Sequence, residues 1–326
     1  MRCLVTGIAG FAGVHLTREL VNDGASVHGY GIEPKLPRSL DDVRDRVEFT
    51  SGDIRDQDSL RETLERVHPD MLFHLAALPH VDRSRDLRIE TLDVNVMGST
   101  AVLQAAAAHD PPPRMLLVSS GQVYGVAPES AMPLKESRSA DPISPYTASK
   151  LCTEIIAKQM WKDDGLPVII VRPFNYVGPG QQPGFVVADF ARQVARVEAK
   201  LIDPVVRVGN LAAQRDFTDV RDMVRGFKLA ATRGKPGATY NLASGKAVSV
   251  QQILDLLIDR SIVPIQVDQD PGRFRPNDVP LVLGDATRAS VDLGWAPVIP
   301  LAQTLDDTLS YWRAQVAQES MADTDL

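Results

Sequence analysis

The segment 144–150, "SPYTASK", places a tyrosine and a lysine four residues apart, Tyr146 and Lys150. If this segment is helical, the two side chains lie on one face and can point into the same cleft. An ammonium group held near a phenol stabilises the phenolate and lowers the phenol pKa from its ordinary value of about 10. The pair is therefore suited to proton transfer near neutral pH.

Two neighbouring features favour this interpretation over that of two unrelated surface residues. Pro145 is a typical first-turn residue, so a helix is expected to begin beside the tyrosine. Earlier in the chain the apolar run "RMLLV" ends in Ser119 and Ser120. Ligands of open parallel sheets bind beyond the carboxyl ends of the strands. The sequence thus predicts that Ser120, Tyr146 and Lys150 form one catalytic site.

A second motif, "TGIAGFAG", stands between the first apolar run and a helical segment. Its spacing is GxxGxxG, which still allows a tight turn, close approach of the backbone and a helix N-terminus directed at a pyrophosphate. We therefore expect it to bind a dinucleotide rather than only to turn the chain. The ends of later strands should line the same crevice. We expect residues 53–54 to lie near the adenine, and residues 76–77 to lie near the ribose and the nicotinamide. The predicted cofactor-binding residues, besides Tyr146 and Lys150, are Gly7, Gly10, Phe11, Ala12, Gly13, Asp53, Ile54, Ala76 and Ala77.

The end of the second strand, "GYGIEP", bears on the choice of dinucleotide. An acidic side chain there accepts hydrogen bonds from the ribose hydroxyls and repels a 2′-phosphate, whereas an arginine attracts that phosphate. Gly31 and Ile32 occupy the informative positions and Glu33 follows. We add Glu33 to the cofactor-binding residues and expect NAD(H) to be favoured over NADP(H). The open alternative is that Glu33 is a solvated loop carboxylate.

The scaffold for these motifs is predicted from the alternation of short apolar runs with amphipathic segments up to Pro173. This alternation is typical of βαβ units, and it predicts an α/β fold with a doubly wound parallel (Rossmann) sheet. Beyond Pro173, loops rich in glycine and proline separate isolated helices, which indicates a smaller, discontinuous α/β substrate domain. We expect residues 1–173 with about 208–233 to form the dinucleotide-binding domain, and 174–207 with 234–326 to form the other.

Composition narrows the class of protein. The 326 residues are 44% hydrophobic and carry a formal net charge of -7, which argues for a small-molecule partner and against nucleic acid or an anionic membrane. The two cysteines give neither a disulfide framework nor a metal spacing, and no leader or membrane span is evident, so a cytoplasmic location is expected. His74 is assigned to the core and no metal site is predicted.

The combination of TGxxGFxG, a serine before "VYG", YxxxK and "RPFNYVGPGQ" resembles the extended short-chain dehydrogenases that act on nucleotide sugars. The segments "GNLAAQRDFTDVRD", "YNLASGKAVSVQQILD" and "RPNDVPLVLGD" are most similar to GDP-4-keto-6-deoxymannose reductases and the related GDP-mannose 4,6-dehydratases. The resemblance covers essentially the whole chain. It implies a GDP-linked keto-sugar substrate and a homodimer built through a four-helix bundle, to which the helices from Asp93 and Tyr146 would contribute.

The resemblance also implies roles for single residues. Ser120 hydrogen-bonds the sugar C4 oxygen, Tyr146 exchanges a proton with it, and Lys150 tunes the tyrosine and holds the nicotinamide ribose. The resemblance also implies that further residues contact the substrate. Two of them, Arg215 and Arg275, would bind the diphosphate, because a guanidinium group matches the geometry of phosphate oxygens. For Arg215 the alternative is a salt bridge with Asp216 or Asp219, and for Arg275 a solvated loop charge. The predicted substrate-binding residues are His80, Ser120, Gln122, Asn175, Arg215 and Arg275.

One position departs from the dehydratases. They carry a glutamate two residues before the tyrosine of "YG", where it removes the C5 proton, and this chain has Gln122. An amide has no useful proton affinity at neutral pH, so Gln122 argues against dehydration more directly than it argues for reduction. The favoured function is NAD(P)H-dependent reduction of the C4 ketone of a GDP-4-keto-6-deoxy-hexose. The alternatives are a nucleotide-sugar 4-epimerase, a GDP-mannose 4,6-dehydratase, and a dinucleotide-binding regulatory or scaffold protein.

Overall fold

The computed structural model describes residues 1–79, 83–274 and 279–324. The chain forms two compact units, each assembled from separate stretches of sequence. The first unit comprises Met1–Phe174, Met223–Leu242 and Asp285–Ala296. The second comprises Asn175–Asp222, Ala243–Gly284 and Pro297–Leu326.

The first unit is built on a seven-stranded sheet in which every neighbouring pair is parallel. The strand order is β10-β6-β5-β4-β1-β2-β3, so the order reverses between β1 and β4. This confirms the predicted doubly wound fold, because such a reversal is its defining feature. The strands are β1 Arg2–Thr6, β2 Ser26–Gly31, β3 Val47–Ser51, β4 Met71–His74, β5 Arg114–Val118, β6 Val168–Pro173 and β10 Thr239–Leu242.

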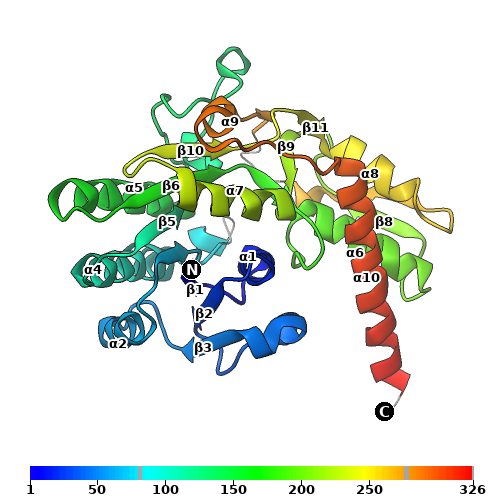
Figure 1. The fold of residues 1–326 in the computed structure, drawn as a ribbon. Coiled ribbons are helices and arrows are strands. Elements are labelled where there is room, and N and C mark those ends of the chain that lie inside the picture. Colours follow the sequence, from blue (N-terminus) through cyan, green and yellow to red (C-terminus); the bar gives the residue numbers. More distant parts are fainter. Residues whose placement is uncertain (80–82, 275–278, 325–326) are drawn as a thin grey trace. The chain divides into compact units, whose positions relative to one another are not determined.

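Helices cover both faces of this sheet, with α2, α4 and α5 on one side and α1 and α7 on the other (Figure 1). All residues of β6, "VIIVRP", the second strand from one edge of the sheet, are buried, as expected of a parallel strand covered on both faces. The helices are α1 Phe11–Asn22, α2 Gln57–Val67, α3 Arg88–Leu92, α4 Ser99–Ala108, α5 Pro145–Asp163, α7 Val220–Arg233 and α9 Thr287–Leu293, and a π-helical segment, η3 Asp93–Gly98, joins α3 to α4.

The later segments that belong to the first unit differ from the predicted segment. The prediction assigned about 208–233 to this domain, whereas the first compact unit includes 223–242 and 285–296. Residues 214–219 belong to the second unit because they form β9, which pairs with other strands of that unit. Residues 239–242 belong to the first because β10 pairs with β6 along its whole length.

The described residues of the second unit form two small sheets and three principal helices. Strand β9 Gln214–Asp219 pairs with β7 Asn175–Val177, β11 Ala247–Ser249 and β13 Leu281–Val282, and β8 Val205–Val208 pairs with β12 Gln266–Gln269. The helices are α6 Val186–Glu198, α8 Val250–Ile258 and α10 Leu301–Thr324. Their apolar faces form one core that includes Phe190, Ile253, Leu309 and Trp312.

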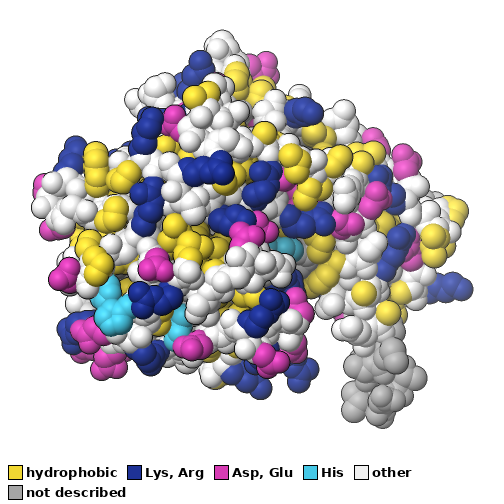
Figure 2. Space-filling model, viewed as in Figure 1, with side chains coloured by type: hydrophobic (Ala, Val, Ile, Leu, Met, Phe, Trp, Pro, Cys, Tyr) yellow, Lys and Arg dark blue, Asp and Glu magenta, His cyan; other side chains and the backbone are white. Residues whose placement is uncertain are grey.

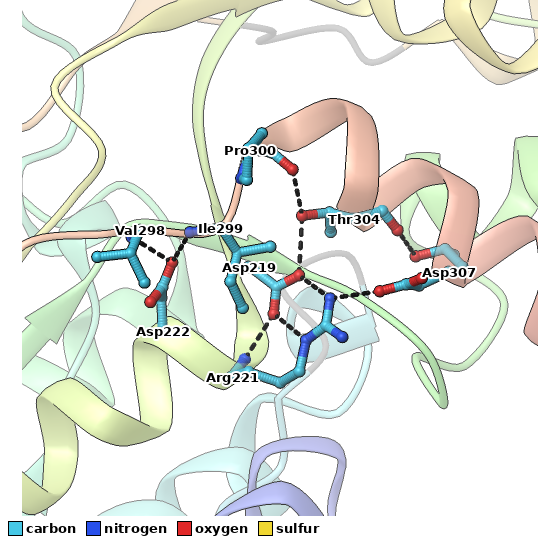
Figure 3. Close-up of polar contacts among 9 residues, drawn as sticks. Asp219, Arg221, Asp222, Val298, Ile299, Pro300, Thr304 and Asp307 are labelled. Carbon is cyan, nitrogen blue, oxygen red and sulfur yellow. Dashed lines mark hydrogen bonds and ion pairs between the residues drawn. The ribbon is translucent and has the colours of Figure 1, made fainter.

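Two buried aspartates fix the start of α10 to the junction of β9 and α7 (Figure 3). Asp219 accepts a hydrogen bond of 2.8 Å from Thr304 Oγ1 and pairs with the Arg221 guanidinium, which also reaches Asp307. Asp222 accepts the main-chain N–H groups of 298 and 299, both at 2.8 Å. These carboxylates of the "DFTDVRD" segment thus have a structural role. Within the described ranges no helix is long and apolar enough to cross a membrane.

Candidate functional site

The glycine motif forms the turn between β1 and α1. Gly7 adopts φ +72°, and a Cβ at this position would lie 2.6 Å from the Ala76 nitrogen. A Cβ at Gly13 would collide with the Gly7 carbonyl oxygen. Glycine is therefore required at both positions, because only a bare backbone allows the turn, the first helical turn and the end of β4 to pack this closely.

This turn fits the pyrophosphate of a dinucleotide. Gly10 is the N-cap of α1 and supplies no side-chain acceptor, and the first turn contains no acidic residue. The first main-chain N–H groups of a helix have no acceptor within the helix, and together with the helix dipole they attract an anion. Phe11 and Ala12 are the first two residues of this helix.

The other predicted cofactor residues lie at the carboxyl ends of β4 and β3, the strands on either side of β1 and β2 in the sheet of the first unit. Ala76 and Ala77 follow β4, with Ala76 against the glycine turn. Asp53 and Ile54 follow β3; Ile54 is buried, while the Asp53 carboxylate pairs with Arg55. The hydrogen bond from Arg55 lowers the pKa of Asp53, so this carboxylate is ionised. Arg55 was not predicted.

Glu33 folds back over the end of β2. A Cβ built on Gly31 would lie 2.6 Å from the Glu33 Oε2 atom, which places the carboxylate directly beside the last residue of the strand. Next to it the Ile32 side chain is 74% exposed. The structure thus places the Glu33 carboxylate at the end of β2.

Helix α5 positions Tyr146 and Lys150. The Ser144 side chain accepts a hydrogen bond from the Thr147 N–H in a capping box, and Pro145 occupies the first turn, so the helix starts where the sequence predicts. Lys150 is only 7% exposed; its Nζ donates to the Val118 carbonyl oxygen at 2.9 Å and lies 6.0 Å from the centroid of the Tyr146 ring. The structure therefore brings the two side chains to one face.

The environment of Lys150 sets its charge state. Burial lowers the pKa of Lys150 to about 8, and the negative charge of Glu154 opposes this effect. The ammonium form therefore predominates at neutral pH, held beside the end of β5. An ammonium at this place stabilises any negative charge that develops on the tyrosine oxygen during proton transfer.

Ser120 stands at the carboxyl end of β5. It is the N-cap of the short helix η4 Gly121–Tyr124, and its Oγ accepts a hydrogen bond of 3.1 Å from the Gln122 N–H. That bond leaves the hydroxyl hydrogen of Ser120 available for another acceptor. The Gln122 side chain is exposed. Ser120 and Lys150 thus both lie at the carboxyl end of β5, since Lys150 donates a hydrogen bond to the carbonyl oxygen of Val118, two residues before Ser120.

His74 is a core residue, as predicted. Its Nδ1 lies 2.7 Å from Thr6 Oγ1 and its Nε2 lies 2.8 Å from Ser99 Oγ. Burial lowers the pKa of His74 to about 3, so the ring is neutral. The described residues contain no group of three or more histidine, cysteine or acidic side chains that could hold a metal ion.

The predicted substrate residues of the second unit lie on its main sheet. Asn175 opens β7, and Arg215 lies on β9, where its Nη1 donates to the carbonyl oxygens of 214 and 279 at 2.8 and 2.6 Å. The alternative partners of Arg215 are engaged elsewhere: Asp219 pairs with Arg221, and Asp216 binds the loop at 244–245 and the N–H of Gly284. His80 and Arg275 lie outside the described residues.

Sequence analysis missed a buried ion pair next to the predicted catalytic residues. Glu154 follows Lys150 by four positions on α5, and its carboxylate accepts two hydrogen bonds from the Arg172 guanidinium and one from Ser119. The spacing of four after the tyrosine–lysine pair was the available signal, because it puts Glu154 on the same helix face. Its partner Arg172, on β6, gives no comparable sequence signal.

Comparisons with known proteins find relatives that match nearly the whole chain. The family model described as GDP-mannose 4,6 dehydratase matches residues 4–308. The GDP-6-deoxy-D-mannose reductase of Pseudomonas aeruginosa is 35% identical over 98% of this chain and 99% of its own. The UDP-glucose 4-epimerase of Mycolicibacterium smegmatis is 31% identical over 96% and 99%. The solved structure of RMD from Pseudomonas aeruginosa complexed with NADPH superimposes with a TM-score of 0.84 at 31% identity, covering 96% of this chain and 99% of that one.

Proposed function

Because the chain belongs to the GDP-mannose 4,6 dehydratase family of extended short-chain dehydrogenases, and is an NAD(P)-dependent oxidoreductase of that type, we propose that it reduces the C4 ketone of a GDP-4-keto-6-deoxy-hexose. The observation that carries this proposal is the helix face shared by Tyr146 and Lys150 at the end of β5, where Ser120 also lies. The full-length similarity to a GDP-6-deoxy-D-mannose reductase supports the choice of substrate.

In this reaction Ser120 and Tyr146 bind the ketone oxygen and stabilise the charge that develops on it. Tyr146 then donates its phenolic proton, and Lys150, as an ammonium group, stabilises the phenolate that remains. When bound, the nicotinamide dinucleotide would supply the hydride for C4. The glycine turn with Phe11 and Ala12, the strand ends at 53–54 and 76–77, and Lys150 hold that dinucleotide.

Gln122 is the residue that favours reduction over dehydration. Dehydration of GDP-mannose requires a base that removes the C5 proton, and the amide of Gln122 cannot act as one. Reduction needs no such base, because the ketone is already present in the substrate. We assign Gln122 and His80 to the binding of the sugar, Asn175 to the nucleotide sugar, and Arg215 with Arg275 to the diphosphate.

For the cofactor we propose NAD(H) over NADP(H). The ionisable Glu33 beside the last residue of β2 supports this preference, since a carboxylate at that point repels a 2′-phosphate. The relative from Pseudomonas aeruginosa was solved with NADPH, which makes the preference a direct point of comparison between the two proteins.

We further propose a homodimer through a four-helix bundle. Ile89 on α3, Met97 on η3 and Ile155 on α5 are 80%, 61% and 60% exposed, and these elements pack against one another. Such a set of large apolar side chains favours burial against a second copy.

The free cysteines, Cys3 and Cys152, support a reducing, cytoplasmic location. Positive and negative side chains are interspersed over the face shown in Figure 2, which does not favour nucleic-acid binding.

The test is product analysis from two incubations of the purified protein. With GDP-mannose and NAD(P)⁺ we expect no 4-keto-6-deoxy product, because the C5 base is missing. With that 4-keto product, made by another enzyme, we expect stoichiometric oxidation of NAD(P)H and a 6-deoxy sugar in the mass and NMR spectra. Efficient conversion of GDP-mannose would contradict the reductase assignment.

The similarity to a UDP-glucose 4-epimerase gives the second candidate function. An epimerase keeps its dinucleotide bound and returns the hydride to the same sugar, so net consumption of NAD(P)H is absent. Inertness toward both GDP-linked substrates, together with dinucleotide retained through purification and interconversion of a nucleotide 4-epimer pair, would favour that function.

A further inference from the structure

The ion pair between Glu154 on α5 and Arg172 on β6 is bidentate and almost fully buried. Arg172 Nε donates to Glu154 Oε1 at 2.9 Å and Nη2 donates to Oε2 at 2.6 Å. The two residues are 1% and 5% exposed. Removing two charges from water costs free energy that their attraction only partly recovers, so a buried pair of this kind contributes little net stability. The function of this ion pair is therefore to be found in the residues that it holds in place.

The pair holds both ends of the segment that carries Ser120. On one side, Ser119 Oγ donates to Glu154 Oε1 at 2.5 Å. On the other side, the Tyr124 ring packs 4.8 Å from Arg172 Cζ, and the Tyr124 hydroxyl donates to Asn241 Oδ1 at 2.8 Å. The catalytic serine therefore lies between two residues that are fixed by one buried salt bridge.

The same pair bears on the charge of Lys150. Among the described residues, the ionisable groups that interact with Lys150 are Tyr146 and Glu154 on α5 and the neutral His74 on β4, while β5 presents the uncharged Val118 carbonyl. Burial lowers the pKa of Lys150 to about 8, and the negative charge of Glu154 opposes that effect. Removing its charge therefore lowers the pKa of Lys150 further.

We propose, on the basis of the proposed reductase function, that Glu154 and Arg172 are positioning residues of the reaction: their ion pair fixes the segment 119–124 that carries Ser120, and the Glu154 carboxylate, one helical turn after Lys150 on α5, is a counter-charge for its ammonium group. Neither residue needs to contact the substrate or the dinucleotide. Ser119 is the link through which the pair acts on Ser120, and it was not among the predicted site residues.

The experiment compares four variants of the full-length protein by kcat, dinucleotide affinity and pH profile. Glu154→Gln removes the charge and keeps the shape, whereas Glu154→Asp keeps the charge and shortens the side chain. Ser119→Ala removes only the bond to the serine segment. Asp163→Asn is the matched control, because Asp163 is an exposed carboxylate on the same helix, bonded to Gln159.

The two parts of the proposal give different signatures. Ser119→Ala and Glu154→Asp should lower kcat by about 10- to 100-fold through misplacement of Ser120, with the alkaline limb of the pH profile unchanged. Glu154→Gln should show the same loss and an alkaline limb moved by about one pH unit toward lower pH. The affinity for the dinucleotide and the Asp163→Asn control should stay at wild-type values.

A purely structural role predicts otherwise. Variants that melt at lower temperature but retain wild-type kcat and an unmoved alkaline limb would overturn the proposal. If Glu154→Gln does not fold because Arg172 is left unpaired, the charge-neutral double variant Glu154→Gln/Arg172→Gln replaces it. A folded double variant should lose kcat to a similar extent, and wild-type turnover in it would overturn the positioning role.

The wild-type protein separates this proposal from the proposed function. Turnover of the 4-keto sugar by the wild type tests the function alone. The charge on Lys150 can be followed without turnover, by NMR titration of ¹³Cε-labelled lysine with Lys150→Met as the assignment control. A Lys150 titration that moves to lower pH in Glu154→Gln supports the electrostatic part whatever the substrate is, and an unmoved titration overturns that part.

Discussion

Replacing Lys150 with methionine should make the folded protein more stable at neutral pH while it abolishes catalysis. The ammonium is buried, and its pKa falls from 10.5 to about 8 on folding. At pH 7 that lowering corresponds to a penalty of about 3 kcal/mol against the folded state. Methionine fills a similar volume without a charge but leaves the Val118 carbonyl without its donor, which costs about 1 kcal/mol. We expect Lys150→Met to raise the free energy of unfolding by about 2 kcal/mol at pH 7.

The pH dependence gives this prediction its sign. Between pH 8 and pH 10.5 the folded lysine is deprotonated while the unfolded lysine still binds its proton, so wild-type stability rises with pH in this window. At pH 10 the penalty has fallen to about 1 kcal/mol, and the two proteins should be equally stable.

The assay is denaturant unfolding of the cofactor-free proteins at pH 7 and pH 10, followed by circular dichroism. Lys162→Met is the control, because Lys162 is an exposed lysine on the same helix and its replacement should change stability by less than about 0.5 kcal/mol. A Lys150→Met protein that is less stable than wild type at pH 7, or whose advantage does not shrink toward pH 10, would refute the reasoning.

Three further predictions concern catalysis, cofactor and assembly. Tyr146→Phe should lower turnover by about 100-fold or more and leave dinucleotide affinity nearly intact, because it removes a proton donor and little binding; wild-type turnover would contradict the chemistry. Wild-type protein should use NADH at least as well as NADPH, and Glu33→Ala should shift the ratio of the two kcat/KM values toward NADPH by about tenfold; a large NADPH preference in the wild type would show the interpretation of "GYGIEP" to be wrong. Ile155→Lys should convert a wild-type dimer into a monomer in light scattering, whereas a monomeric wild type would remove the dimer proposal.

The parts of the fold that were predictable are those with local signals. Six strands of the large sheet, the glycine turn and the start of α5 each follow from short runs of residue types and their spacing. Strand β10 was missed, because "TYNL" is short and half polar and stands among glycine-rich loops; only its pairing with β6, far back in the sequence, makes it a strand. The boundaries of the second unit depend on the same kind of long-range pairing.

The candidate site divides in the same way. Tyr146 and Lys150 share a helix, so their proximity follows from a spacing of four. Arg172 lies on a strand, and its contact with Glu154 exists only because α5 packs across β6. From the sequence alone, an arginine in "VIIVRP" could equally have been a ligand-binding residue at the strand end. Tertiary packing determines which of these two roles Arg172 has, and that packing cannot be read from local patterns in a single sequence.

The order of the strands has a consequence for synthesis on the ribosome. Strand β6 is complete at Pro173, but the strand that covers its outer edge begins only at Thr239, and the second unit is only partly made in between. During that interval the nascent sheet ends in an open edge, where the mostly apolar strand β6 presents unpaired main-chain N–H and C=O groups, and unfinished chains aggregate through such edges. A premature stop between these two strands would therefore release a product with a nearly finished dinucleotide fold that is a target for chaperones and proteases.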